Sequence, residues 1–406
     1  MRRRDHDPRG PEPEYEPPRR SARLVAPLVG LLLGAVLVAS ALVGSPEPLH
    51  GHLVGPLEVH PLEGLSSAVA PARDASEGAV PAPAAGAFEE VEPASQGMDP
   101  ERLARGVERL RGQAGLRSLL VVRNGRVVAD ESFAGGDLND RPHDVKSASK
   151  SLLSALVGIA IERGAIRGVD ATVGELLPGY ARGLPEAKRA ITLGDLLAME
   201  SGLGSTSGEH YGAWVSNGDW TAAALARPLD AEPGAGFTYS TGNSHLISAI
   251  LTEATGRSTL ELAREWLLEP LGVEVAGWER APEGYYFGGN SFEVTPRGLA
   301  RFGQLYLEDG RRGDRRVVPA DWIERSTRRH AEGWPDRYGA YGWLWWLPPD
   351  DPWESFAAIG YGGQFLYIVP ELEMLAVVTA THEPKGAEWD RETFAILRQD
   401  VFGAAG

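Results

Sequence analysis

The alternation of apolar and polar positions divides the chain into an uncharged stretch, a Pro-rich segment and a long patterned region. The uncharged stretch runs from Leu24 to Val43, which is about the 20 residues that a helix needs to span a bilayer. Residues 45–97 are rich in Pro, Ala, Gly and Glu without sustained periodicity, and this composition predicts an extended linker. Patterned sequence begins at Met98, so we expect one folded domain over residues 98–404.

The distribution of positive charge around the uncharged stretch predicts its orientation in a membrane. Residues 1–23 hold several arginines, and the first Lys or Arg after the stretch is Arg73. By the positive-inside rule, residues 1–23 form a cytoplasmic polar tail, residues 24–44 a transmembrane signal anchor, and the rest lies outside the cytoplasm. The protein is then a single-pass protein of the cell membrane. The alternative is a secreted protein whose signal peptide is cleaved near Ala39-Ser40-Ala41.

Two pairs of apolar segments, one at each end of the patterned region, predict strands. Ser118–Arg123 and Arg126–Phe133 flank Asn124-Gly125, which is a strong hairpin turn signal. Near the C-terminus, Gln364–Val369 and Met374–Thr379 flank a second turn. Both pairs are expected in one sheet.

Helices are expected before, between and after these strands. Asp99-Pro100-Glu101 begins a helix, with a capping aspartate and proline at the first helical position. Ser151–Glu162 is apolar nearly all round, which predicts a central buried helix. A mostly helical, loop-rich stretch continues to about residue 330, and a closing helix is expected over Trp389 to Val401. The predicted fold class is therefore α+β, an antiparallel β-sheet flanked by helices with a mostly helical subdomain inserted, preceded by one transmembrane helix.

Composition excludes several classes of function. The formal net charge of −16 argues against a nucleic-acid binder, which would carry a basic face. The absence of cysteine removes thiolate nucleophiles and Cys-ligated zinc. Lysine occurs only at Lys146, Lys150, Lys188 and Lys385, and unlike arginine a buried lysine can lose its proton.

The segment Lys146-Ser147-Ala148-Ser149-Lys150 lies directly before the buried helix. Ser147 and Lys150 are three residues apart at the helix start, which places their side chains on one face of the first turn. A serine hydroxyl needs an adjacent base to act as a nucleophile. Lys150 is such a base if burial lowers its pKa, and the apolar helix would supply that burial. The alternative is a serine cap followed by a solvated lysine.

Two further segments hold candidate site residues. Tyr239 and Thr241 precede the apolar helix His245–Glu253, and a tyrosine there can transfer protons if nearby cations lower its pKa. Tyr361-Gly362-Gly363-Gln364 precedes the strand Gln364–Val369, and its glycines allow a substrate to lie along the strand edge. The backbone N–H groups of Gln364 and Ser147 could then form an oxyanion hole. Each segment alone is also compatible with plain packing or with a structural bend.

Taken together, these motifs resemble the serine β-lactamase and penicillin-binding protein superfamily, in particular its class C-like branch with esterases, D-aminopeptidases and 6-aminohexanoate-dimer hydrolases. Leu196 to Leu203 resembles the family phrase LLtMtSGL, and Leu299 to Leu305 resembles DmARFGqL. The resemblance covers roughly residues 98–400. It implies that Ser147 is acylated, that Lys150 activates it, that Tyr239 shuttles protons, and that Tyr361, Gly363 and Gln364 line the site.

The chain departs from this family pattern at two positions. Thr241 stands where the Y-x-N motif has its asparagine, and Tyr361 stands at the basic position of the third motif. A β-lactam or a D-Ala-D-Ala terminus would lose the usual cationic partner of its carboxylate. We therefore expect an amide or ester hydrolase acting on a small molecule, with a D,D-carboxypeptidase or β-lactamase as the alternative and a catalytically silent binding or sensor module as the second.

No cofactor is implied, and the histidines lack metal-ligand spacing, so we predict no metal site. Asp219-Trp220 could form part of a lid over the site.

Overall fold

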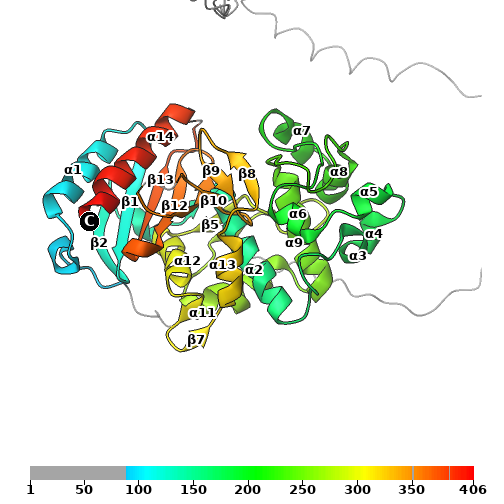
Figure 1. The fold of residues 1–406 in the computed structure, drawn as a ribbon, viewed down its shortest axis with the longest axis horizontal. Helices are drawn as coiled ribbons and strands as arrows, with labels where there is room; N and C mark the ends of the chain where they lie inside the picture. The colour runs from blue at the N-terminus through cyan, green and yellow to red at the C-terminus, as the bar shows by residue number, and fades with distance from the viewer. Residues whose placement is uncertain (1–87, 350–351, 384) are drawn as a thin grey trace, which may run out of the picture. The chain divides into compact units, whose positions relative to one another are not determined.

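The computed structural model describes residues 88–349, 352–383 and 385–406, and its centre is an eight-stranded antiparallel sheet (Figure 1). In sheet order the strands are β2 (Arg126–Ser132), β1 (Leu116–Arg123), β13 (Met374–Ala380), β12 (Gln364–Val369), β11 (Phe356–Gly360), β10 (Trp346–Leu347), β9 (Gly339–Tyr341) and β8 (Ala331–Trp334). Both predicted hairpins are present. In the first, Asn124 and Gly125 have φ of 51° and 71°, the left-handed values that a two-residue type I′ turn requires.

The two predicted hairpins are joined by the pairing of β1 with β13, in which Leu120 lies opposite Val377. The sheet is thus completed by strands from opposite ends of the domain, as predicted. The edge formed by β8, β9 and β10 was not predicted, because these strands are only two to four residues long and lack clear alternation.

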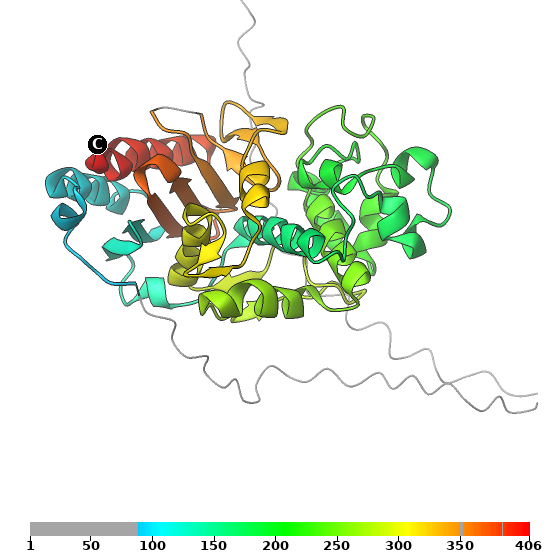
Figure 2. The same ribbon diagram turned by 60° about the horizontal axis from the view of Figure 1, so that its bottom comes forward.

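Helices cover both faces of the sheet (Figure 2). On β12, Phe365 and Tyr367 pack against Phe394 of α14 (Ala387–Ile396). Leu366 and Ile368 point to the other face, where Gly303 of α12 (Pro296–Leu307) lies close to both. Helix α1 (Pro100–Arg111) lies beside α14, and its predicted cap Asp99 accepts hydrogen bonds from the backbone N–H groups of Glu101 and Arg102.

The mostly helical subdomain lies to one side of the sheet and is connected to it by the buried helix α2 (Lys150–Glu162) (Figures 1 and 2). Its longest helix is α9 (Thr241–Thr255). The shorter helices are α3 (Val173–Leu176), α4 (Pro178–Ala181), α5 (Glu186–Arg189), α6 (Leu193–Leu197), α7 (Tyr211–Val215), α8 (Trp220–Ala226), α10 (Thr259–Leu262) and α11 (Glu269–Leu271). Remaining elements are β3 (His143–Asp144), β4 (Gly277–Trp278), β5 (Phe292–Val294), β6 (Arg311–Arg312), β7 (Arg315–Arg316) and α13 (Ala320–Ser326).

Residues 88–97, which the sequence analysis assigned to the linker, contact the sheet. The N–H of Val91 donates to the carbonyl of Val127 over 3.0 Å, and the N–H of Val127 donates to the carbonyl of Glu89 over 2.9 Å. Pro93–Gln96 forms a 3₁₀ helix. The Pro- and Ala-rich composition concealed this segment, which satisfies backbone groups on the outer edge of β2. The domain therefore includes residues 88–97.

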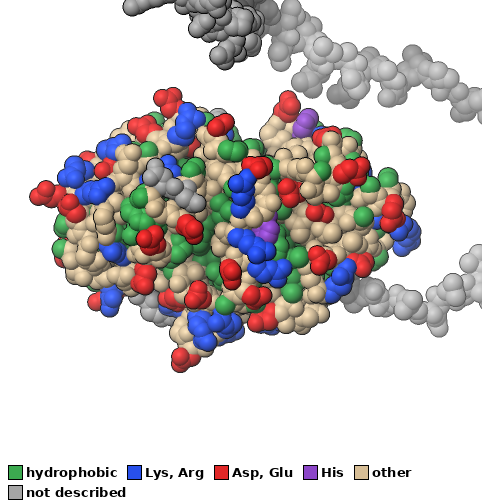
Figure 3. Space-filling view, in the orientation of Figure 1, with side chains coloured by type: hydrophobic (Ala, Val, Ile, Leu, Met, Phe, Trp, Pro, Cys, Tyr) green, Lys and Arg blue, Asp and Glu red, His purple; other side chains and the backbone are tan. Residues whose placement is uncertain are grey.

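The predicted cytoplasmic tail and transmembrane anchor, residues 1–23 and 24–44, lie outside the described residues. In the part of the chain that the structure describes, no helix has both the length and the apolar character needed to cross a bilayer. Charged side chains of both signs are interspersed over the face in Figure 3, with Lys and Arg side chains gathered at the β6–β7 hairpin.

Candidate active site

Ser147 lies in a 3₁₀ turn, Lys146–Ser149, that leads directly into α2, and its side chain is partly exposed. The preceding residue, Lys146, has a φ of 52°, a left-handed conformation that costs a non-glycine residue about 1 kcal/mol or more. Asp144 stabilises this turn, because its carboxylate accepts from the Lys146 N–H over 2.9 Å and from the Lys146 ammonium over 2.5 Å. The strained turn presents the Ser147 hydroxyl at the mouth of the buried helix.

Lys150 is the first residue of α2, and its side chain is buried, with 2% exposed. The predicted contact with Ser147 is present, with 2.9 Å between Lys150 Nζ and Ser147 Oγ. The amine also donates to the Gly289 carbonyl over 2.8 Å and lies 3.5 Å from Thr241 Oγ1. Burial lowers the pKa of Lys150 to about 7. A substantial fraction of this amine is therefore neutral at physiological pH and able to accept a proton.

Tyr239 lies two residues before α9 and above the lysine, with Lys150 Nζ 5.4 Å from the centre of its ring. Burial raises the pKa of Tyr239 to about 12, although a hydrogen bond with the Ser147 side chain acts in the opposite direction. The sequence analysis required nearby cations to lower this pKa, and that condition is not met, because burial of Tyr239 raises it. Tyr239 is thus a neutral phenol, suited to donate and relay protons rather than to act as a phenolate base.

Thr241 and Asn243 lie in different environments, and only Thr241 is close to Lys150. Thr241 Oγ1 lies between Lys150 Nζ and Ser207 Oγ, at 3.5 Å and 3.0 Å. Asn243 is buried in the helical subdomain, where its Oδ1 accepts from Ser201 Oγ over 3.0 Å. Thr241 therefore occupies the position next to the lysine, and Asn243 does not substitute for the missing motif asparagine.

The end of β11 at Gly360, just before the turn Tyr361–Gly363, lies against the nucleophile turn. A Cβ placed on Gly360 would come within 2.2 Å of the Val145 carbonyl and 3.2 Å of Lys146 Cβ. The Gln364 side chain points away into the sheet, where Nε2 donates to the Ala380 carbonyl over 2.9 Å. The side chain of Gln364 is therefore held within the sheet, and the oxyanion hole formed by the N–H groups of Gln364 and Ser147 stays a prediction. The Tyr361 side chain is 56% exposed.

An aromatic wall formed by Trp334, Tyr341 and Trp346 lies beside Tyr239. Tyr239 stacks on Trp346 with 5.8 Å between ring centres, and Trp334 of β8 lies 5.3 Å from Tyr239. Trp334 is 39% exposed, and with Tyr361 it is one of the two large hydrophobic side chains that are exposed in the described residues. Trp220, predicted as part of a lid, is instead buried and lies in a cluster with Trp214 and Phe287.

Sequence reasoning missed two contributors to the site, the Gly289 carbonyl and the Asp144 carboxylate. Gly289 lies 139 positions from Lys150, so no local pattern connects them, although the pair Gly288-Gly289 is a signal for close backbone approach. Among the described residues, no group of three or more His, Asp or Glu side chains gathers as a metal site.

The fold and the site define a class of protein: an antiparallel sheet with helices, a serine and a buried lysine one turn apart at a helix start, and a tyrosine above them. The model of the β-lactamase family matches residues 103–400, and the chain belongs to this family, within the serine β-lactamase and penicillin-binding protein superfamily of hydrolases.

Individual relatives are distant. The chain is 24% identical to a 6-aminohexanoate-dimer hydrolase of Paenarthrobacter ureafaciens, over 69% of this chain and 76% of that protein. It is also 24% identical to penicillin-binding protein 4 of Amycolatopsis lactamdurans, over 55% of this chain and 67% of that protein. Among solved structures, a penicillin-binding protein homologue from Pyrococcus abyssi has a TM-score of 0.57 at 19% identity, covering 74% of this chain and 77% of that one. The hydrolase EstCE1 has a TM-score of 0.60 at 17% identity, covering 73% and 98%. At these identities the structural matches show the fold alone.

Proposed function

We propose that this protein is a serine hydrolase that cleaves an amide or ester bond through an acyl-enzyme on Ser147. The observation that carries this proposal is the 2.9 Å contact between a buried lysine amine and the serine hydroxyl. Burial of this amine without an ion pair penalises its charged form, which leaves a neutral amine beside the hydroxyl.

In the acylation step, the Ser147 hydroxyl proton moves to the neutral amine of Lys150 as Oγ bonds to the substrate carbonyl carbon. The carbonyl oxygen becomes an oxyanion, which the backbone N–H groups of Ser147 and Gln364 are proposed to stabilise. The bond to the leaving group then breaks. Tyr239 donates its proton to the leaving nitrogen or oxygen and regains one from the Lys150 ammonium, so Lys150 ends the step neutral.

Deacylation runs through the same groups. Water attacks the acyl carbon while its proton moves through Tyr239 to Lys150. The acid product leaves when the proton returns to Ser147 Oγ. The cycle consumes one water and needs no group that the chain does not supply.

Labelling with a fluorophosphonate probe tests the nucleophile directly. Wild-type protein should form one adduct on Ser147, and Ser147→Ala should abolish both labelling and ester hydrolysis with an unchanged melting temperature. Ser149→Ala is the matched control, because Ser149 lies on the same turn, is buried and donates to the Lys146 carbonyl over 2.7 Å. An unlabelled wild-type protein would instead indicate a silent binding or sensor module.

The proposed substrate class is supported by two exposed side chains, those of Tyr361 and Trp334. The third motif has Tyr361 in place of a basic residue, and Trp334, whose ring centre lies 5.3 Å from that of Tyr239, adds exposed aromatic surface. We infer that neutral amides and esters are better substrates than molecules that carry a carboxylate beside the scissile bond. Similarity to a penicillin-binding protein keeps D,D-carboxypeptidase or β-lactamase activity as the second candidate. Stoichiometric labelling of Ser147 by a fluorescent penicillin, faster than by neutral esters, would favour that candidate.

We also propose that residues 24–44 anchor the catalytic domain on the outer side of the cell membrane. The support is the uncharged length of this segment and the arginines before it. Full-length protein should require detergent for extraction from membranes, and its domain should be cleaved by protease added to intact cells. Release of a shortened protein into the medium would identify a cleaved signal peptide instead.

A further inference from the structure

The neighbours of Lys150 restrict the direction of its lone pair. A neutral amine has two hydrogens and one lone pair, whereas a backbone carbonyl can only accept. The Gly289 carbonyl at 2.8 Å must therefore receive one N–H, and Thr241 Oγ1 at 3.5 Å can receive the other. The lone pair is then left facing Ser147 Oγ. The position of the Gly289 carbonyl thus decides whether the amine is aimed at the nucleophile.

Helix α9 fixes the Gly288-Gly289 segment at two points. Ser244 Oγ donates to the Gly288 carbonyl over 2.8 Å, and the Gly288 N–H donates to His245 Nδ1 over 3.3 Å. A Cβ on Gly289 would lie 2.4 Å from Lys150 Cγ, so the backbone of this segment is in direct contact with the lysine side chain.

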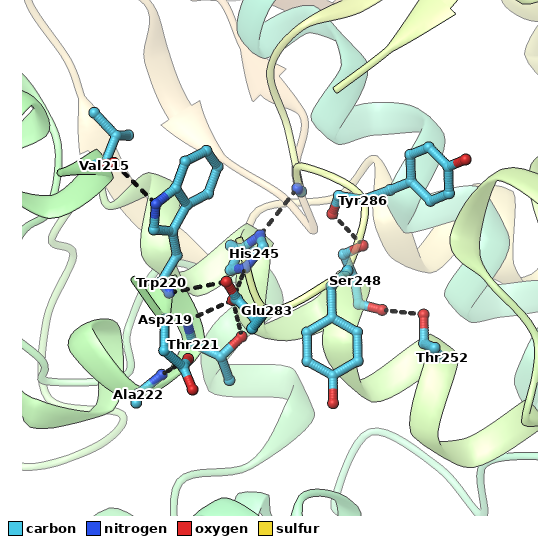
Figure 4. A network of polar contacts seen from close by, with 12 residues as sticks. Val215, Asp219, Trp220, Thr221, Ala222, His245, Ser248, Thr252, Glu283 and Tyr286 are labelled. Carbon is cyan, nitrogen blue, oxygen red and sulfur yellow. Dashed lines mark hydrogen bonds and ion pairs between the residues drawn. The ribbon is translucent and has the colours of Figure 1, made fainter. Parts of the chain in front are cut away.

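His245 is held in one orientation by Glu283. Because Nδ1 accepts the Gly288 N–H, the ring proton is assigned to Nε2, which donates to Glu283 Oε1 over 2.9 Å (Figure 4). Both side chains are buried, with exposed fractions of 0% for His245 and 7% for Glu283. Trp220 and Phe287 pack edge-on to the imidazole, with ring centres 5.7 Å and 6.1 Å away.

The carboxylate of Glu283 is itself anchored at the start of α8. It accepts from the backbone N–H groups of Trp220 and Thr221 over 3.1 Å and 2.9 Å, and from Thr221 Oγ1 over 2.8 Å (Figure 4). Burial raises the pKa of Glu283, but the hydrogen bond from His245 and these donors outweigh burial and lower it to about 2. A buried carboxylate such as that of Glu283 costs free energy that apolar side chains of similar size would not cost. Glu283 therefore has a role beyond packing.

We propose that His245, fixed by Glu283, is a positioning residue that holds the Gly288-Gly289 segment so that the Gly289 carbonyl aims the Lys150 amine at Ser147. The inference rests on the proposed function for its catalytic consequence. Its structural part is that His245 determines the surroundings of Lys150 without contacting it, and this can be measured without catalytic turnover.

NMR of the lysine side chains tests this effect of His245 on Lys150. The chain has four lysines, so labelling with ¹³C-lysine gives four side-chain signals, which are followed as the pH is changed. Wild-type protein should show the Lys150 signal titrating near pH 7. In His245→Phe, which keeps an aromatic ring but has no nitrogen, the Gly288 N–H loses its acceptor and water reaches the loosened segment. The Lys150 midpoint should rise by about one unit, and kcat for a nitrophenyl ester should fall about tenfold or more with KM within about twofold.

His245→Asn restores an acceptor near the position of Nδ1 and should recover most of kcat. If His245→Phe does not fold, His245→Gln replaces it, since its amide can reach Glu283 while offering nothing to the Gly288 N–H. Ser248→Ala is the matched control on the same helix face, because it removes a buried 2.7 Å bond to the Tyr286 carbonyl (Figure 4).

A folded His245→Phe protein with a wild-type Lys150 midpoint and wild-type kcat overturns the proposal, as does an equal shift in Ser248→Ala. A wild-type protein that fails to hydrolyse any ester counts against the proposed function, while the lysine titration still decides this inference.

Discussion

At the residue scale, the four lysines of the chain show what distinguishes a catalytic amine from a structural one. Lys188 donates to the carbonyls of Leu225 and Arg227 at the end of α8, over 2.7 Å and 2.6 Å. Lys146 pairs with Asp144, and Lys385 donates to Thr381 Oγ1. Lys150 alone in this set lies beside a serine hydroxyl. Burial lowers the pKa of both Lys150 and Lys188, so it is the neighbour rather than the shift that identifies the base.

The pKa of about 7 for Lys150 predicts the pH dependence of acylation. Below pH 7 the amine is protonated and cannot accept the serine proton, so kcat/KM should fall tenfold for each pH unit. Above pH 7 the rate should reach a plateau that continues to about pH 10, because Tyr239 stays protonated up to about pH 12.

Measuring kcat/KM for ester hydrolysis from pH 5 to pH 10 gives this profile. Lys188→Gln is the control: its kcat/KM should have the same pH midpoint, although the protein should be less stable. A rate that stays flat from pH 5 to pH 9 would contradict the assignment of Lys150 as the base.

The neutral phenol of Tyr239 makes a different prediction for leaving groups. Tyr239→Phe should lower kcat/KM, which reports acylation, by about 10² or more for an anilide, because the departing nitrogen needs a proton. The loss in kcat/KM should be much smaller for a nitrophenyl ester, since nitrophenolate leaves without a proton. The measurement is the ratio of kcat/KM for the two substrates.

Tyr341→Phe is the control for this experiment. Tyr341 lies in the same aromatic wall, with its ring centre 4.7 Å from that of Trp346 and 6.5 Å from that of Tyr239. Equal losses on both substrates in Tyr239→Phe would show that the hydroxyl positions the reacting groups and does not protonate the leaving group.

At the element scale, a buried carboxylate on α14 holds the turn between β8 and β9. Asp390 is 2% exposed and accepts from Arg337 Nε over 2.9 Å and from the Tyr338 hydroxyl over 2.7 Å. Asp390→Ala should lower the free energy of unfolding by about 3 kcal/mol, because it leaves a half-buried guanidinium and a buried hydroxyl unpaired.

Urea unfolding measures this loss, and Asp400→Ala provides the comparison. Its partner Arg109 is 46% exposed, so breaking that pair should cost less than about 1 kcal/mol. Similar losses for the two variants would argue against a special role for the Asp390 contacts.

The elements that the sequence predicts well are those whose signals are local. The Asn124-Gly125 turn, the cap at Asp99 and the strand Gln364–Val369 each depend on neighbouring residues, and the structure has all three. Strands β9 and β10 have no such signal. They form because Tyr341 and Trp346 pair across the edge of an existing sheet, which is a tertiary effect.

The candidate site also has one part that local sequence predicts and another that it does not. The spacing of Ser147 and Lys150 is a local feature of one helical turn, so their contact could be predicted. The surroundings of the amine could not, since Thr241 and Gly289 approach it from 91 and 139 positions away. The direction of the Tyr239 pKa shift was also beyond the sequence, because it depends on how deeply the ring is packed.

At the scale of the whole molecule, the pairing of β1 with β13 places strands from both ends of the domain side by side in one sheet. One edge of this sheet is β2, and an open edge is a site for unwanted pairing with other chains. Residues 89–91 cover part of this edge through Val127, and Glu89 and Glu90 add ion pairs with Arg126 and Arg297 at 3.0 Å and 2.8 Å.

A chain that starts at Met98 should therefore fold less stably than one that starts at Phe88. It loses two backbone hydrogen bonds to Val127, and we expect its free energy of unfolding to fall by about 1–3 kcal/mol. The kcat of both proteins should be equal, because residues 88–97 contribute no side chain to the contacts around Lys150. Light scattering should show concentration-dependent association of the shorter protein alone, since its β2 edge is open. Identical unfolding curves and equal solubility would mean that the segment merely rests on the sheet, and that the edge of β2 is protected by its own twist and charge.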